Sequence, residues 1–185
     1  TSGYELRKIR HDYNDLSIGL KSLISNQKYD EVLPLLQKYD SEIIGSFQIL
    51  YNTGNDLTDA ILSDKQKNAG DNIKIEFEGS LANVPADNLE ICVLFNNMID
   101  IAFDNVKKFC GNSKQIVTLK AETRAGFLFC CVSFPIKGEI KKAQNNVLYH
   151  SFAYKTLKNL AEKNGGKIET NLSKNRLAIT TGWAI

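Results

Sequence analysis

Apolar residues near the N-terminus recur at alternating spacings of three and four positions. They are Leu6, Ile9, Tyr13, Leu16, Leu20 and Leu23. This is the a/d stripe of a heptad repeat, and it predicts an amphipathic helix. A polar break over 25–31 separates it from a second stripe, formed by Leu36, Tyr39, Ile43, Phe47 and Leu50. Two helices with a short connection predict an antiparallel hairpin.

A lone hairpin leaves an apolar face uncovered on each helix, and two arrangements would cover it. Two chains can pair into a four-helix bundle, or both stripes can dock on the downstream part of the same chain. We favour the homodimer. We therefore assign residues 1–52 to a dimerisation hairpin and residues 53–185 to a second domain.

Beyond residue 55 the pattern changes to alternating helices and strands. Helices are expected at 56–70, 88–109 and 149–166, and strands at 73–79, 115–123, 126–134, 167–171 and 176–183. The second and third strands are expected to form a hairpin that turns at Arg124-Ala125-Gly126. Helices against a mostly antiparallel sheet predict an α+β fold, a two-layer sandwich.

Composition and charge exclude several classes of protein. The chain is 43% hydrophobic and 24% charged with a net charge of +2, so nucleic acid is not an expected partner. No run approaches the roughly 18–20 apolar residues of a membrane span, and no secretory signal opens the chain. The four cysteines lack zinc or redox spacing and are expected to be reduced thiols in or near the core. We expect a cytoplasmic location, as a free protein or as the cytoplasmic part of a membrane protein.

The first candidate for chemistry is His11, in the polar part of the first helix. With Leu6 at heptad position a, His11 falls at f on the outer face, and Asp12 falls at g. An exposed imidazole can act as a nucleophile at cellular pH, and an adjacent carboxylate can fix its tautomer and accept its proton. Arg7 and Arg10 would stabilise a bound phosphate. The simplest alternative is a solvated surface histidine without a role.

Four segments carry a resemblance to a known family. They are RHDYND at 10–15, TGNDLTDAILSDKQKNA at 53–69, LFNNMIDIAFDN at 94–105 and HSFAYKTLKNLAEKNGGKIE at 150–169. In this order they resemble the phosphoacceptor box, the segment after the hairpin, the N-box helix and the nucleotide lid of two-component sensor histidine kinases, in the quorum-peptide-receptor branch. The resemblance implies a phosphotransfer hairpin with His11 as phosphoacceptor, followed by an ATPase domain of the Bergerat type.

The implied ATP site departs from the family pattern in three places. Ile101 stands where the family has its magnesium-binding asparagine, and an alkyl side chain offers no oxygen ligand. Ser151 and Ala153 replace the two lid glycines that let backbone amides approach phosphates. The adenine-side box, expected near 133–139, has a proline and one glycine. We therefore expect neither a bound nucleotide nor a metal.

Polar residues still surround this degenerate nucleotide site. Asn97 and Asp100 lie on neighbouring turns of the expected N-box helix, but Asp100 matches another family position and is no evident substitute for the lost ligand.

A further departure is Asp15, four residues after His11, where relatives that dephosphorylate their partner have Asn or Thr. A carboxylate there would repel an incoming phosphorylated aspartate instead of orienting a water for its hydrolysis, so we do not expect phosphatase activity.

Three hypotheses follow from the resemblance. In the first, the chain is a phosphorelay phosphotransferase like those of sporulation relays, and His11 exchanges a phosphoryl group with a response-regulator receiver domain or a partner histidine kinase. In the second, it is a divergent sensor histidine kinase that still uses ATP and magnesium. In the third, it is a non-enzymatic pseudokinase that acts as a dimerisation partner.

Overall fold

The computed structural model describes residues 3–39, 48–110, 113–136, 151–173 and 175–185. The chain divides into two compact units, Thr1–Phe47 and Gln48–Ile185. Several predicted features lie outside the described residues: Ile43 and Phe47 of the second stripe, residues 137–139 of the adenine-side box, and His150. Within the described residues, no helix is long and apolar enough to cross a membrane.

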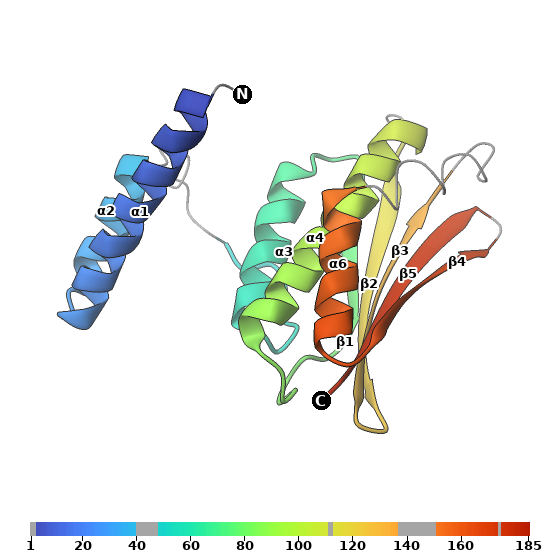
Figure 1. Cartoon of the computed structure of the whole chain (residues 1–185). Helices are drawn as coiled ribbons and strands as arrows, with labels where there is room; N and C mark the ends of the chain where they lie inside the picture. The colour runs from blue at the N-terminus through green and yellow to red at the C-terminus, as the bar shows by residue number, and fades with distance from the viewer. Residues whose placement is uncertain (1–2, 40–47, 111–112, 137–150, 174) are drawn as a thin grey trace. The chain divides into compact units, whose positions relative to one another are not determined.

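The first unit contains α1 (Gly3–Ser25), a short 3-10 turn η1 (Tyr29–Glu31) and α2 (Val32–Tyr39). The two helices lie side by side (Figure 1), as the stripes and the polar break predict. Helix α1 ends where Gln27 adopts a φ of +56° and Lys28 N donates to Leu23 O at 2.9 Å. These are the marks of a left-handed helix cap, which releases the chain into the turn.

The apolar stripe of α1 is only partly covered. Leu16 and Leu20 are half-buried, whereas Tyr13 and Ile9, one and two turns before Leu16, are 67% and 61% exposed. A soluble helix rarely leaves two consecutive seam positions in water. The described residues of this unit therefore leave part of the seam uncovered.

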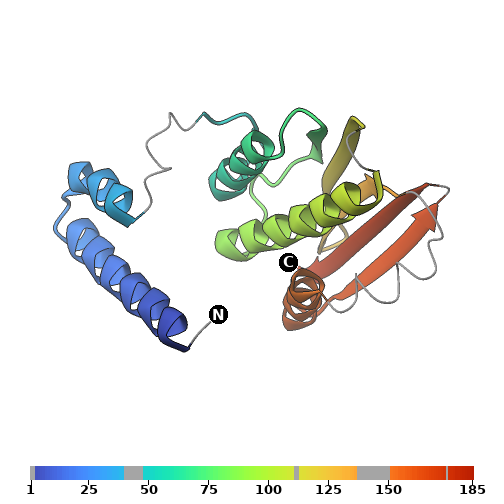
Figure 2. The same ribbon diagram turned by 90° about the horizontal axis from the view of Figure 1, so that it is seen from above.

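The second unit is a two-layer α+β structure. Its helices are α3 (Asp56–Asn68), α4 (Asn88–Cys110) and α6 (Phe152–Lys163), and its strands are β1 (Ile73–Gly79), β2 (Gln115–Arg124), β3 (Phe127–Pro135), β4 (Lys167–Ser173) and β5 (Arg176–Ala184). The sheet order is β1-β2-β3-β5-β4, and the helices cover one face (Figures 1 and 2). Among the described strands, only β1 and β2 pair in parallel. The predicted fold class is confirmed.

Alternation along the central strands separates a core face from an outer face. Leu128, Cys130 and Val132 of β3 and Ile179 of β5 are buried on the side of the helices, while the residues that alternate with them are more exposed. Helix α4 supplies Phe95 and Met98 to the same core. The outer face, by contrast, has no described helix over it.

The β2–β3 connection has the predicted tight turn. Ala125 and Gly126 have φ values of +52° and +77°, as in the two-residue hairpin turn that matches the twist of its strands. Helix α6 starts later than predicted, at Phe152 instead of residue 149. The reason is Ser151, whose hydroxyl accepts from Tyr154 N at 3.1 Å and caps the first turn.

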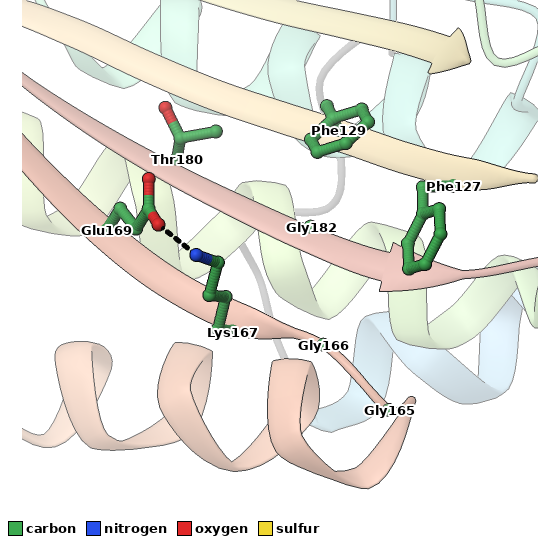
Figure 3. Close-up of a pocket in the computed structure, with 8 residues that line it drawn as sticks. All are labelled: Phe127, Phe129, Gly165, Gly166, Lys167, Glu169, Thr180 and Gly182. Carbon is green, nitrogen blue, oxygen red and sulfur yellow. Dashed lines mark ion pairs between the residues drawn. The ribbon is translucent and has the colours of Figure 1, made fainter. Parts of the chain in front are cut away.

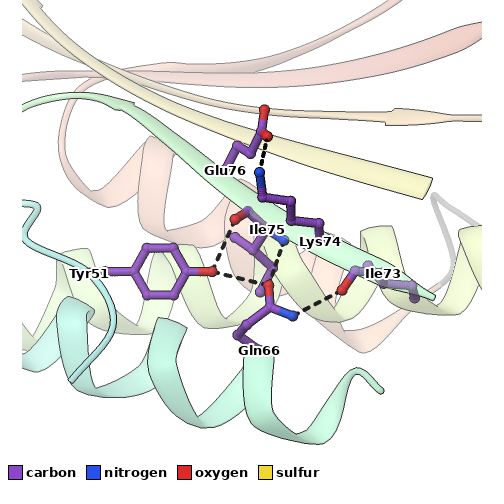
Figure 4. Close-up of polar contacts among 6 residues, drawn as sticks. All are labelled: Tyr51, Gln66, Ile73, Lys74, Ile75 and Glu76. Atoms are coloured by element: carbon purple, nitrogen blue, oxygen red, sulfur yellow. Dashed lines mark hydrogen bonds and ion pairs between the residues drawn. The ribbon is translucent and has the colours of Figure 1, made fainter. Parts of the chain in front are cut away.

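A side-chain amide pairs with the free edge of β1 (Figure 4). Gln66 of α3 donates Nε2 to Ile73 O at 3.0 Å and accepts from Ile75 N at 2.7 Å, so it imitates a neighbouring strand. Tyr51 adds its hydroxyl, 3.1 Å from Gln66 Oε1 and 3.0 Å from Ile75 O. Burial, and then the charge of Glu76, raise the pKa of Tyr51 to about 12. The arrangement protects an edge that would otherwise expose backbone groups.

Candidate functional site

His11 lies on the outer surface of α1, as its heptad position predicts. Its side chain is 74% exposed, and its Nδ1 atom is 3.2 Å from Asp15 Oδ2 and 3.7 Å from Asp12 Oδ1. Asp15 is one helical turn further along and reaches back over the ring. The residue expected to assist, Asp12, is thus the more distant of two carboxylates on the same nitrogen. Both favour a proton on Nδ1, which leaves Nε2 as the nucleophilic nitrogen.

Two exposed apolar side chains share the face of His11. Tyr4 and Ile18 lie seven residues before and after it, which places them near the same face of the helix. They are 77% and 68% exposed. A histidine between two uncovered apolar side chains is suited to a surface that receives another protein.

The two arginines named from the sequence are exposed and close to His11 along the helix. Arg7 is one turn before His11 and Arg10 is its direct neighbour. Both side chains are long enough to reach a phosphoryl group held at the ring. Their stabilising role stays a prediction.

The α4 residues of the implied nucleotide site serve the helix and its packing. Ile101 is 2% exposed and belongs to the hydrophobic core. Asn97 is buried, and its Nδ2 donates to Val93 O of the preceding turn at 2.7 Å. Ile101 is thus a core residue, and the side-chain amide nitrogen of Asn97 is hydrogen-bonded within its own helix.

Asp100 is engaged by a different helix. Its carboxylate forms an ion pair with Lys65 of α3, so its side chain lies on the α3 side of α4. Lys65 is the less exposed partner of the pair. This contact ties α3 to α4.

The lid positions also have structural partners. Ser151 caps α6 through its hydroxyl, and Ala153 packs against the hydrophobic core. A further structural pair joins this helix to α4: Glu90 binds Lys163 in an ion pair and accepts from Asn164 Nδ2 at 3.0 Å. The Lys163 hydrogen bond, followed by that of Asn164, lowers the pKa of Glu90.

The TGND segment after the hairpin is a structural motif. Thr53 N donates to Asp59 Oδ1 at 2.7 Å, and Asn55 caps α3 by accepting from Thr58 N at 2.9 Å. Gly54 has a φ of +90° and lies so close to Ala82 that a Cβ would collide with it. The resemblance in this segment therefore reflects the way that the chain enters α3.

Among the described residues, no group of three or more His, Cys, Asp or Glu side chains could hold a metal ion. The cysteines there are free: Cys92, Cys110 and Cys130 are buried and Cys131 is half-buried. Burial raises the pKa of Cys92 and, more strongly, that of Cys130. They are thiols in or near the core, as predicted.

Comparison with known proteins gives a consistent result at the level of fold. No family model matches the chain, and no curated protein matches it. Solved structures do. The catalytic domain of histidine kinase ThkA is 18% identical, with a TM-score of 0.52 over 70% of this chain and 92% of that one. The histidine kinase AdeS from Acinetobacter baumannii is 10% identical, with a TM-score of 0.54 over 96% of both chains.

A third match covers the whole chain. A histidine kinase from Burkholderia phymatum STM815 is 13% identical, with a TM-score of 0.53 over 100% of this chain and 99% of that one. At these identities the likeness shows the fold. The chain has the Bergerat-type fold of histidine kinase catalytic domains, which confirms the fold that the sequence resemblance implies.

Proposed function

We propose that this chain is a histidine phosphotransfer protein of a two-component phosphorelay. His11 accepts a phosphoryl group from the aspartate of a response-regulator receiver domain, or from a partner histidine kinase, and passes it on. The observation that carries the proposal is the geometry at His11: an exposed ring whose Nδ1 faces the carboxylates of Asp15 and Asp12.

The chemistry needs only groups that this surface supplies. The Nε2 lone pair attacks phosphorus, the bond from phosphorus to the aspartyl oxygen breaks, and the receiver's carboxylate leaves with the electron pair. The Nδ1 proton moves towards Asp15 as the ring gains the phosphoryl group, so the phosphorylated ring is neutral instead of an imidazolium cation. Phosphoryl transfer depends mainly on positioning and on electrostatic stabilisation, which Arg7 and Arg10 strengthen.

Two exposed surfaces of α1 serve different partners in this account. Ile9 and Tyr13 lie on the heptad seam and are uncovered, which supports pairing with a second copy of the chain into a four-helix bundle. Tyr4 and Ile18 flank His11 on the opposite face and support docking of the receiver domain. The two surfaces are formed by different residues, so substitutions can test the two roles separately.

The ATPase-like domain does not use nucleotide in this proposal. The residues present do not fit magnesium: Ile101 is buried in the core and offers no ligand, and the carboxylate of Asp100 is paired with Lys65. Ser151 and Ala153 add Cβ atoms where the family places glycines. The domain then supports the hairpin and contacts partners, and His11 is phosphorylated only in trans.

The direct test is phosphoryl transfer from receiver domains of the same genome. Phosphorylated receivers are mixed with the full chain, and acid-labile phosphate on the chain is followed. We expect labelling that is lost in His11→Gln and kept in His150→Gln. Failure of every receiver and every partner kinase to label the wild-type chain would favour the non-enzymatic pseudokinase.

A second candidate is an active, divergent histidine kinase. Two solved structures described as histidine kinases, AdeS and the Burkholderia phymatum kinase, support this candidate, because each aligns with this chain over nearly its whole length. Thermal unfolding with millimolar Mg-ATP separates the two. A ligand at a hundredfold excess over its Kd stabilises the native state by about 2.7 kcal/mol. The phosphotransfer account predicts no such shift.

A further inference from the structure

Exposed apolar side chains gather where the first turns of α3 and α4 meet. Leu57 of α3 and Leu89 of α4 are 46% and 62% exposed. The two turns are in contact: the Cys92 thiol lies 3.6 Å from Leu57 O, and Asn55 Nδ2 donates to Asn88 Oδ1 at 2.9 Å. Leu89 directly follows Asn88 and comes one turn before Cys92, so the two leucines lie on adjoining parts of the helical surface.

One turn further along, each helix adds another apolar side chain. Ile61 and Val93 follow the two leucines at i+4 and extend both rows in the same direction. Both are half-buried, and neither is among the half-buried side chains that pack against the hydrophobic core. The ion pair between Lys65 and Asp100 shows that the two helices stay side by side beyond this point. We call the four apolar residues the α3–α4 face: Leu57, Ile61, Leu89 and Val93.

The α3–α4 face has the shape that another helix packs on. Its side chains form two short rows, one on each of two neighbouring helices (Figures 1 and 2). The axes of packed helices are about 8–10 Å apart, and side chains of a third helix can interdigitate with such rows. A recurring form of recognition lays the apolar stripe of an amphipathic helix against a surface of this kind.

Acidic side chains surround the α3–α4 face. Asp56 begins α3, Asp87 directly precedes α4, and Asp64 lies two turns after Leu57 on the same side of its helix. All three are exposed, and none of them has an ion-pair partner among the described residues. Asp87 Oδ1 also accepts from Glu90 N at 2.9 Å, which leaves its negative charge in place.

The lysines beside the α3–α4 face are already paired. Lys65, beyond the apolar residues of α3, pairs with Asp100, and Lys163 pairs with Glu90 in the first turn of α4. Each pair is neutral, so the three unpaired carboxylates decide the sign of the local charge. Their field favours a partner with positive charge.

The outer face of the sheet offers fewer free groups. The trough along β5 is lined in part by Phe129, Gly182 and Lys167 (Figure 3). The Phe129 ring covers Gly182 so closely that a Cβ there would lie 3.0 Å from the ring, and Lys167 is ion-paired with Glu169. The groups of the trough thus contact one another, whereas the leucines of the α3–α4 face lie open to solvent.

We propose that the α3–α4 face binds an amphipathic helix of a partner protein, with lysine or arginine residues beside its apolar stripe. The stripe packs on the four apolar side chains, and the basic residues pair with Asp56, Asp64 and Asp87. These contacts are independent of phosphoryl transfer at His11. They give the ATPase-like domain a binding role that needs no nucleotide.

The test measures the fluorescence anisotropy of a labelled peptide mixed with the full chain. The probe is an alanine-based helix of about 18 residues, longer than the length at which isolated helices are marginal in water. It carries leucines at i, i+4 and i+7, flanked by lysines. We expect saturable binding. A peptide with glutamate in place of lysine, and one of the same composition with the leucines out of helical register, should bind about tenfold or more weakly.

Substitutions locate the binding surface. Leu57→Gln combined with Leu89→Gln removes the exposed apolar contacts and keeps good helix formers, so it should weaken binding about fivefold or more. Ile116→Thr is the control, because Ile116 is 43% exposed on β2. Asp64→Asn should weaken binding and reduce its dependence on salt. Glu78→Gln, which removes an exposed carboxylate of β1, should do neither.

Thermal unfolding of each variant checks that it is folded, and labelling of His11 by a phosphorylated receiver is measured in parallel and should be unchanged. The proposal is overturned if binding of the lysine peptide does not saturate, if the peptide with misplaced leucines binds equally well, or if the face variants and their controls behave alike. Each of these outcomes leaves the result for His11 to be judged separately.

Discussion

The carboxylate of Asp15 lies 3.2 Å from Nδ1 of His11, nearer than the neighbouring Asp12 at 3.7 Å. The helix brings residues four positions apart onto one face, so Asp15 is the better placed proton acceptor. We expect Asp15→Asn to slow phosphorylation of His11 about tenfold or more, towards the 10²–10⁴ range of general-base effects. Asp12→Asn should slow it less. Rapid-quench labelling of both variants checks the order, and an equal or inverted effect would contradict it.

The exposed seam of α1 predicts a dimer that one pair of substitutions disrupts. Ile9→Glu combined with Tyr13→Glu places charges in the bundle interface and should give monomers in sedimentation experiments at micromolar concentration. Ile18→Glu is the control, because Ile18 is equally exposed but lies on the face of His11. It should leave the dimer intact and slow transfer from the receiver. A wild-type chain that is already monomeric would rule out the bundle.

The ion pair between Glu90 of α4 and Lys163 of α6 predicts that part of the protein's stability is lost at acid pH. The pKa of Glu90 is lowered from its ordinary value of 4.5, first by Lys163 and then by Asn164. Its stabilising contribution is therefore complete above that value and is lost as the pH falls through the lowered pKa. Urea unfolding between pH 7 and 3 should show a smaller loss of stability in Glu90→Gln.

The control for this prediction is Glu162→Gln. Glu162 pairs with Lys158 at 3.7 Å, with both side chains more than half exposed. Pairs of this kind contribute little, so Glu162→Gln should retain the acid dependence of the wild type. If Glu90→Gln does so too, the α4–α6 ion pair does not contribute to stability.

The raised pKa of Tyr51 predicts that the protein loses stability at alkaline pH. Its neutral hydroxyl holds Gln66 and the β1 edge, and its pKa is raised from 10.0 to about 12. This stabilisation is complete below pH 10 and is lost as the pH rises towards 12, because the unfolded chain ionises first. Tyr51→Phe should cost about 1–2 kcal/mol at neutral pH and remove part of the alkaline loss. Tyr29→Phe, at an exposed site, should do neither.

Much of the fold was predictable because local patterns and tertiary packing agree. The alternation at 73–79 matches β1, and the turn at Ala125-Gly126 lies within the predicted Arg124-Ala125-Gly126 turn, so β3 begins one residue later than predicted. The start of α6 was misplaced because the apolar pattern extends past its cap, and a serine in sequence does not reveal whether its hydroxyl is used. Helix existence follows from periodicity, whereas helix ends depend on single hydrogen bonds.

The site was predictable only in part. The outward direction of His11 followed from the heptad, but the relative distances of Asp12 and Asp15 depend on rotamers that a repeat does not specify. The pairing of Gln66 with β1 and the trough over Gly182 depend on contacts between segments distant in the sequence. Such contacts leave no local pattern.

The central claim is that His11 is phosphorylated by another protein and not by this chain's own domain. The measurement that tests it most directly compares two phosphoryl donors for the same chain: radiolabelled Mg-ATP alone, and a radiolabelled phosphorylated receiver. The account predicts acid-labile label on His11 from the receiver and none from Mg-ATP. Label from Mg-ATP alone, lost in His11→Gln, would contradict it and establish the chain as a kinase.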